Sequence, residues 1–152
     1  MRVCLAAQVL SSSVEDALTL LDEDETTETR KLIRLMDKFF DCLNVRNTFH
    51  GTTTRYENLH PYTKCNDEQL KWLKETFLGY FDEWEKEMKS LPAGTVTKKE
   101  KAAMKLSKET VEGLRITTMS LTELIPILLS DDDCKYILSE VFSQDPLEIN
   151  FS

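Results

Sequence analysis

The segment Thr29–Asn47 has the sequence TRKLIRLMDKFFDCLNVRN. Its apolar residues recur at steps of three and four, which places them on one face of a helix. These residues are Leu32, Ile33, Met36, Phe39, Phe40 and Leu43. Charged side chains fill the opposite face. The spacing therefore predicts an amphipathic helix that packs on the rest of the chain through its apolar face.

Three further stretches repeat this spacing and predict long helices over residues 3–21, 67–89 and 107–128. Ser11–Ser13 is expected to kink or divide the first of them. Asp67 is a candidate N-cap of the second, because a short acidic side chain can accept hydrogen bonds from the first turn. Pro126 is expected to distort the last turn of the third, because proline lacks a backbone N–H.

The apolar stripes of the later helices are interpreted as core positions: Leu70, Leu73, Phe77, Phe81, Trp84 and Met88, then Val111, Leu114, Thr118, Leu121, Leu124 and Leu128. A shorter helix is expected near Thr97. The consecutive aspartates 131–133 are expected to form a turn, because adjacent side chains diverge. Since every long periodic stretch is helical, the predicted fold class is all-α, with about five or six helices in an irregular bundle.

Length and composition are those of a soluble globular domain. The chain has 152 residues, of which 41% are hydrophobic and 30% charged. A net charge of −8 argues against strong nucleic-acid binding by this chain alone. No apolar run reaches membrane-spanning length. The four cysteines form no CxxC pair, which indicates reduced thiols of an intracellular protein, and cysteine and histidine spacing fits no common zinc pattern.

A small polar cluster lies near the end of the Thr29–Asn47 helix. Phe40, Asp41 and Asn44 fall within about one helical turn of each other. A ring that stacks, a carboxylate and an amide can together bind a planar heterocycle. Spacing alone favours a plainer interpretation, in which Phe40 is a core residue, Asp41 is solvated and Asn44 lies near a helix C-terminus.

Three blocks of sequence resemble a known family. They are Val3–Ser11 (VCLAAQVLS), Phe40–Asn44 (FDCLN) and Ser143–Glu148 (SQDPLE). In this order they resemble P-element-type (THAP-associated) DNA transposases. The resemblance implies a fragment of a larger RNase H-like transposase. Residues 1–50 would be the end of the guanine-nucleotide-binding insertion, residues 51–66 a linker, and residues 67–152 the helical return into the C-terminal part of the catalytic domain.

The resemblance also implies a nucleotide site. Phe40, Asp41 and Asn44 would help to hold the guanine base of GTP, and Asp145 would approach the nucleotide from the catalytic domain. The chemistry suits the base, because one carboxylate can accept both the N1–H and the exocyclic amine of guanine. No P-loop is present in the sequence, so a partial site is expected.

Glu148 has two interpretations that the sequence leaves open. By resemblance it is the last catalytic carboxylate of an RNase H-like site, where it would bind Mg²⁺ in a two-metal mechanism. By local sequence it is the N3 residue of a capping box, with Asp145 at the N-cap and Pro146 at N1.

The intact family cleaves and joins transposon-end DNA in a GTP-dependent reaction, self-associates, and is nuclear. Its first two catalytic aspartates lie upstream of the insertion, so we expect this chain to lack them, as well as the THAP zinc finger, and to be inactive alone. Two alternatives remain. One is an α-helical interaction module that docks through Trp84 and its aromatic neighbours. The other is a truncated regulator that binds a full-length transposase.

Overall fold

The computed structural model describes residues 7–21, 24–49, 57–92 and 106–142. These residues are helical, with irregular connections and one isolated β-bridge between Tyr62 and Ile137. The chain divides into two compact units. We call residues 1–63 together with 136–152 the split unit, and residues 64–135 the hairpin unit. The hairpin unit is therefore an insertion in the sequence of the split unit.

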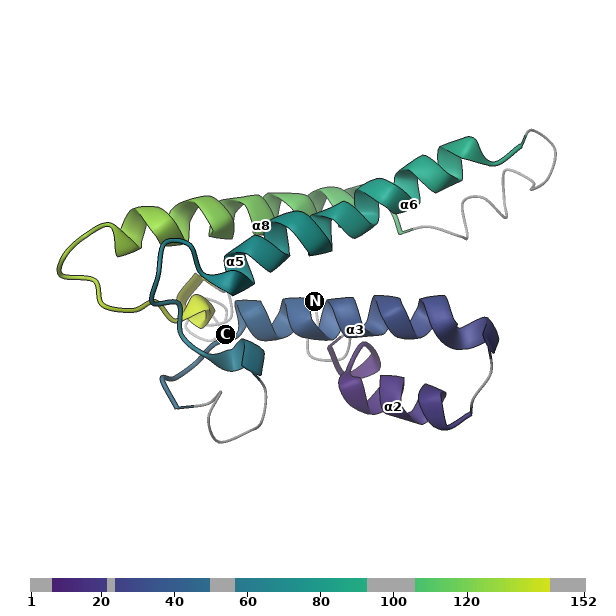
Figure 1. The fold of residues 1–152 in the computed structure, drawn as a ribbon, viewed down its shortest axis with the longest axis horizontal. Helices are drawn as coiled ribbons and strands as arrows, with labels where there is room; N and C mark the ends of the chain where they lie inside the picture. Colours follow the sequence, from purple (N-terminus) through teal and green to yellow (C-terminus); the bar gives the residue numbers. More distant parts are fainter. Residues whose placement is uncertain (1–6, 22–23, 50–56, 93–105, 143–152) are drawn as a thin grey trace, which may run out of the picture. The chain divides into compact units, whose positions relative to one another are not determined.

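The split unit is built around α3 (Thr27–Leu43), which follows η1 (Asp24–Thr26) and pairs with α2 (Ser12–Leu20). The two helices run antiparallel (Figure 1), because Arg34 binds Glu15 at 2.5 Å and Arg30 binds Thr19 at 3.4 Å. The apolar face predicted for this helix is confirmed at its centre. Its buried residues are Ile33, Met36, Phe39 and Cys42.

Two short segments from distant parts of the sequence pack near the end of α3. They are η2 (Glu57–Leu59) and η4 (Ser139–Phe142). The Tyr62 N–H donates to the Ile137 carbonyl at 3.0 Å, and the Ile137 N–H donates to the Tyr62 carbonyl at 2.9 Å. These two residues stand next to the points where the chain leaves for the hairpin unit and returns from it, so the bridge closes the neck of the insertion.

The hairpin unit has a first arm made of α5 (Glu68–Trp72), the π-helical segment η3 (Leu73–Phe77) and α6 (Leu78–Ser90). Figure 1 shows these as one continuous helix. Asp67 caps it, because its Oδ1 accepts a hydrogen bond from the Gln69 N–H at 2.9 Å, and the predicted N-cap is confirmed. The predicted stripe is also confirmed as core: Leu70, Leu73, Phe77, Phe81 and Met88 are buried, and Trp84 is half-buried.

The second arm is α8 (Lys108–Leu129), whose N-cap Ser107 accepts a hydrogen bond from the Thr110 N–H. Its buried residues are Thr118, Leu121 and Ile125. The predicted stripe is therefore wrong at Leu124 and Leu128, which are 39% and 38% exposed. Several overlapping stripes satisfy helical spacing here, because apolar residues surround the second half of the helix, and periodicity cannot select among them.

The all-α class is confirmed for the described residues. Counted with α5, η3 and α6 as one, they contain four long helices, slightly fewer than the five or six predicted. The division near Ser11 is confirmed, since residues 7–9 are helical and α2 starts at Ser12.

The predicted aspartate turn is present, with Asp131 Oδ1 accepting a hydrogen bond from the Asp133 N–H. The helix expected near Thr97 lies outside the described residues, among which no helix is long and apolar enough to cross a membrane.

Candidate functional site

Phe40, Asp41 and Asn44 occupy the last turn of α3 and its C-cap, and all are half-buried. Asn44 follows Phe40 by four residues, and Asp41 follows Asp37 by four, so each pair shares one side of the helix. Asp37 contacts Ser12 at the start of α2. The site therefore lies at the end of the helix pair, on the part of α3 that extends past the start of α2.

The Asn44 side chain is a helix cap. Its Nδ2 donates to the Phe40 carbonyl at 2.6 Å, and its backbone N–H donates to the Asp41 carbonyl at 3.2 Å. This confirms the plainer interpretation for Asn44. It does not exclude a binding role, because an amide has two N–H groups and an oxygen, and the cap uses one N–H. The cap also fixes the orientation of the amide relative to the Phe40 backbone.

The Asp41 carboxyl group is not the fully solvated group of the plainer interpretation. Burial raises its pKa to about 6, and the negative charge of Asp37 adds to the rise. Burial also raises the pKa of Asp37, assisted by Glu15 and opposed by hydrogen bonds from the backbone and side chain of Ser12. Carboxylates kept in surroundings that disfavour their charge are common at functional sites, where a ligand supplies the missing donors.

Two residues that the sequence did not single out hold the end of α3 in place. The Cys42 carbonyl accepts hydrogen bonds from Tyr62 Oη at 2.9 Å and from Ser139 Oγ at 2.7 Å. Ser139 Oγ also accepts from the Val45 N–H at 3.1 Å. Since Cys42, Tyr62 and Ser139 are buried, this polar clamp satisfies groups that water cannot reach. No local pattern marks Tyr62 or Ser139, because both act through distant residues.

The clamp brings the C-terminal part of the split unit next to the cluster. The Glu140 N–H donates to the Val45 carbonyl at 3.3 Å, and the Glu140 carboxylate binds Arg46 at 2.9 Å. Glu140 precedes Asp145 by five residues in the sequence. Asp145 and Glu148 themselves lie outside the described residues, so the structure reports no position for either.

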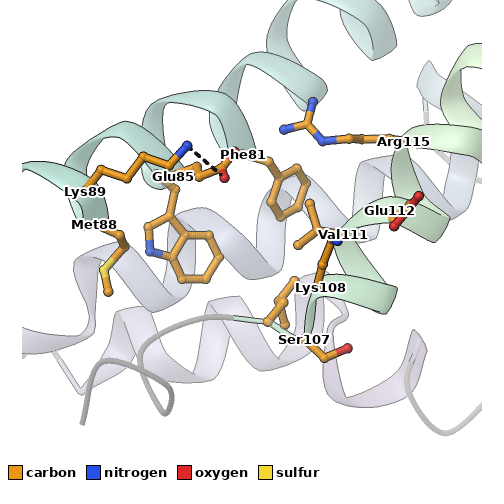
Figure 2. Close-up of a pocket in the computed structure, with 11 residues that line it drawn as sticks. Phe81, Glu85, Met88, Lys89, Ser107, Lys108, Val111, Glu112 and Arg115 are labelled. Atoms are coloured by element: carbon orange, nitrogen blue, oxygen red, sulfur yellow. Dashed lines mark ion pairs between the residues drawn. The ribbon is translucent and has the colours of Figure 1, made fainter. Parts of the chain in front are cut away.

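A separate groove of about 840 Å³ lies in the hairpin unit, between α6 and the first turns of α8. Figure 2 shows Phe81, Met88 and Val111 lining it. At its polar edge Lys89 binds Glu85 at 3.1 Å. None of the residues predicted for the nucleotide or metal site lines this groove, but Trp84, the residue through which the alternative interaction module would dock, does. Within the residues that the structure describes, no three His, Cys, Asp or Glu side chains gather closely enough to hold a metal ion.

Comparison with protein families gives one match. Residues 1–58 match the model of the TNP-like, GTP-binding insertion domain. The matched region contains α2, α3 and the cluster of Phe40, Asp41 and Asn44. This part of the chain is therefore similar to the GTP-binding insertion domain of transposase-like proteins. Comparisons with curated proteins and with solved structures gave no match.

Proposed function

We propose that the end of α3 is the base-recognition part of a guanine-nucleotide site in a P-element-type DNA transposase. Phe40 would stack on the base, while Asp41 and Asn44 would hydrogen-bond to its edge. One observation carries the proposal. Ser139 and Glu140, which precede Asp145 in the sequence, hydrogen-bond to Cys42 and Val45, and these are the sequence neighbours of Asp41 and Asn44 in the segment that matches the insertion domain.

The charge on Asp41 explains the choice of base. An ionised carboxylate accepts two hydrogen bonds, and guanine offers its N1–H and exocyclic amine on one edge. Adenine has an acceptor at N1, which cannot hydrogen-bond to the carboxylate, so the site should not bind adenine. With a pKa of about 6, Asp41 is mostly ionised at neutral pH. Its partial burial strengthens a hydrogen bond to a ligand, because little water competes for the carboxylate.

The proposed site covers the base and not the phosphates. The sequence contains no P-loop, and Arg46, a basic residue just after α3, is paired with Glu140. We therefore expect this chain alone to bind GTP weakly or not at all. In the intact transposase, GTP and Mg²⁺ would serve DNA cleavage and joining in the nucleus, on self-associated protein bound to transposon-end DNA.

Calorimetry with GTP and ATP tests the partial site. With this chain we expect little or no heat of binding on titration with either nucleotide. A complete relative should bind GTP selectively and lose that preference when the residue matching Asp41 is changed to Ala. Asp16→Ala is the matched control in this chain's numbering, because Asp16 is an exposed aspartate of α2. Tight, guanine-selective binding by this chain alone would contradict the partial site, and an unchanged preference in the Asp41 variant would remove the assignment.

Glu148 is proposed as a metal-binding carboxylate of the catalytic domain. In a complete relative, the change matching Glu148→Gln should abolish DNA cleavage, because the amide lacks the charge that a divalent cation needs. The same change should lower stability by well under about 1 kcal/mol, because the amide oxygen can still complete a capping box. Normal cleavage rates in the Gln variant would leave Glu148 as a helix cap only.

A further inference from the structure

The second half of α8 carries apolar side chains on all sides. Its inner side buries Thr118, Leu121 and Ile125 within the hairpin unit. The side chains that point elsewhere form what we call the outer α8 face: Ile116, Met119, Leu124, Ile127 and Leu128. Ile116, Met119 and Ile127 are 60%, 52% and 67% exposed. A helix that is apolar all round normally has neighbours all round.

The outer α8 face has the length of a helix-docking surface. Ile116 and Ile127 are separated by eleven residues, which corresponds to about 16 Å along the helix axis, or three turns. Met119 follows Ile116 by three residues, and Leu124 precedes Ile127 and Leu128 by three and four, so the face has two apolar groups with the exposed Ser120 and Glu123 between them. Exposed apolar residues grouped in this way mark an interaction surface more often than scattered single ones do.

The charges within the stretch that forms this face are acidic, and a basic residue lies at each end of it: Arg115, which is paired with Asp82, and Lys135. Between Ile116 and Cys134 the sequence has no Lys, Arg or His, and its acidic residues are Glu123, Asp131, Asp132 and Asp133. All four are exposed. The C-terminal end of α8 adds the negative end of its helix dipole. An apolar face with an acidic surround repels nucleic acid and anionic lipid. A second copy packed in parallel would bring the same acidic groups together.

We propose that the outer α8 face binds an amphipathic helix of a partner protein, with aliphatic residues on one face and Lys or Arg beside them. The aliphatic residues cover Ile116, Met119 and Ile127. The basic residues reach Glu123 and the aspartates 131–133. This is recognition of a helix by apolar anchors at helical spacing, with charge setting the choice of partner.

The probe is a synthetic helical peptide of about 20 residues, or between about five and six turns, with a leucine face and lysine flanks, which is long enough to cover the outer α8 face. A second peptide has the same leucine face and glutamate in place of lysine. Fluorescence anisotropy with the full chain should show saturable binding of the lysine peptide and none of the glutamate peptide. Equal binding of both peptides would overturn the proposal, because it would show nonspecific apolar contact.

Paired variants locate the binding. Ile116→Gln with Ile127→Gln should weaken the lysine peptide by about tenfold or more, as for central apolar anchors in an interface. Val9→Gln with Leu20→Gln is the control, since Val9 and Leu20 are 65% and 87% exposed in the split unit. It should change affinity less than about twofold, as expected for residues outside the contact. Similar losses in both pairs, or none in the first, would overturn the assignment.

A second pair of variants tests whether binding depends on the local aspartates or only on the net charge of the chain. Changing Asp131, Asp132 and Asp133 to Asn should weaken binding more than changing Glu75, Glu83 and Glu87 to Gln, although both triples remove the same charge. Asn also keeps the oxygen that accepts from the backbone in the aspartate turn. Equal effects would reduce the attraction to net charge and overturn the stated partner chemistry.

Analytical sedimentation and vesicle-binding assays test whether the outer α8 face binds a second copy of the chain or a membrane instead. We expect a monomer at micromolar concentration and no binding to phosphatidylserine vesicles. Self-association that the Ile116→Gln, Ile127→Gln variant abolishes would assign the face to a second copy. Vesicle binding lost in the same variant would assign it to a membrane. Either result would overturn the proposal of a basic partner helix.

Discussion

The hairpin unit and the end of α3 are held together by different means. The hairpin unit buries Phe77, Phe81 and Leu121, which come from its two arms. The end of α3 relies on hydrogen bonds to Cys42 from Tyr62, 20 residues away, and from Ser139, 97 residues away. One region is held mainly by apolar packing, and the other adds buried hydrogen bonds.

The difference has consequences for stability and function. Apolar burial is non-directional, so it stabilises a fold even when side chains shift slightly. A buried hydrogen bond is directional, and the protein is destabilised sharply when one of its two partners is removed. The clamp therefore holds the α3 terminus in one precise arrangement. Such precision suits a binding site, where donors and acceptors must meet a ligand within narrow limits. The candidate nucleotide site stands at the polar clamp, while each unit also has buried apolar residues of its own.

The largest effect is expected from Phe77→Ala in the hairpin unit. Phe77 is fully buried and its ring lies 5.2 Å from that of Phe81. The cavity should lower the free energy of unfolding by about 3–5 kcal/mol. Hydrogen exchange should show the loss in residues 64–135 and leave the Tyr62–Ile137 bridge protected. An equal loss of protection in both units would show that they unfold together and would break the comparison.

A smaller effect is expected from Ser139→Ala in the clamp. Cys42 O would keep its bond from Tyr62, but the buried Val45 N–H would lose its partner. Urea unfolding should show a free energy of unfolding lower by about 2 kcal/mol, as expected for a buried donor left without an acceptor. Ser130→Ala is the control, because Ser130 is exposed and its Oγ donates to the Pro126 carbonyl only four residues away. A loss no larger than that of the control would mean that the clamp is not a determinant of stability.

Sequence patterns predicted the hairpin unit better than they predicted the site. Spacing located the Asp67 cap and the stripe through Phe77, because helical periodicity and capping depend on near neighbours. It failed at Leu124 and Leu128, where several apolar stripes overlap. It could not find Tyr62 or Ser139, because nothing nearby in the sequence records a contact across 20 or 97 residues. The same limit applies to Asp41, whose burial depends on its tertiary neighbours.

The smallest effect, of opposite sign, is expected from Asp41→Asn. Because burial and Asp37 raise the pKa of Asp41 from 3.8 to about 6, the folded chain holds this proton more tightly than the unfolded chain does. The stability contributed by protonated Asp41 is thus complete below about pH 4 and is lost as the pH rises through about 6. At pH 7 the folded chain carries a half-buried charge in the last turn of α3, where the helix dipole disfavours it.

Asparagine removes this charge at every pH, so the variant should be more stable than the parent at pH 7 and about equal to it at pH 4. The displaced pKa corresponds to at most about 3 kcal/mol. Because the side chain is partly exposed and solvent screens it, we expect about 1 kcal/mol. Urea unfolding at both pH values measures the difference, with Asp16→Asn as the exposed control. A gain of the same size at pH 4 and pH 7 would show that packing, and not charge, is responsible. Asp41 would then no longer be a residue that trades stability for a ligand.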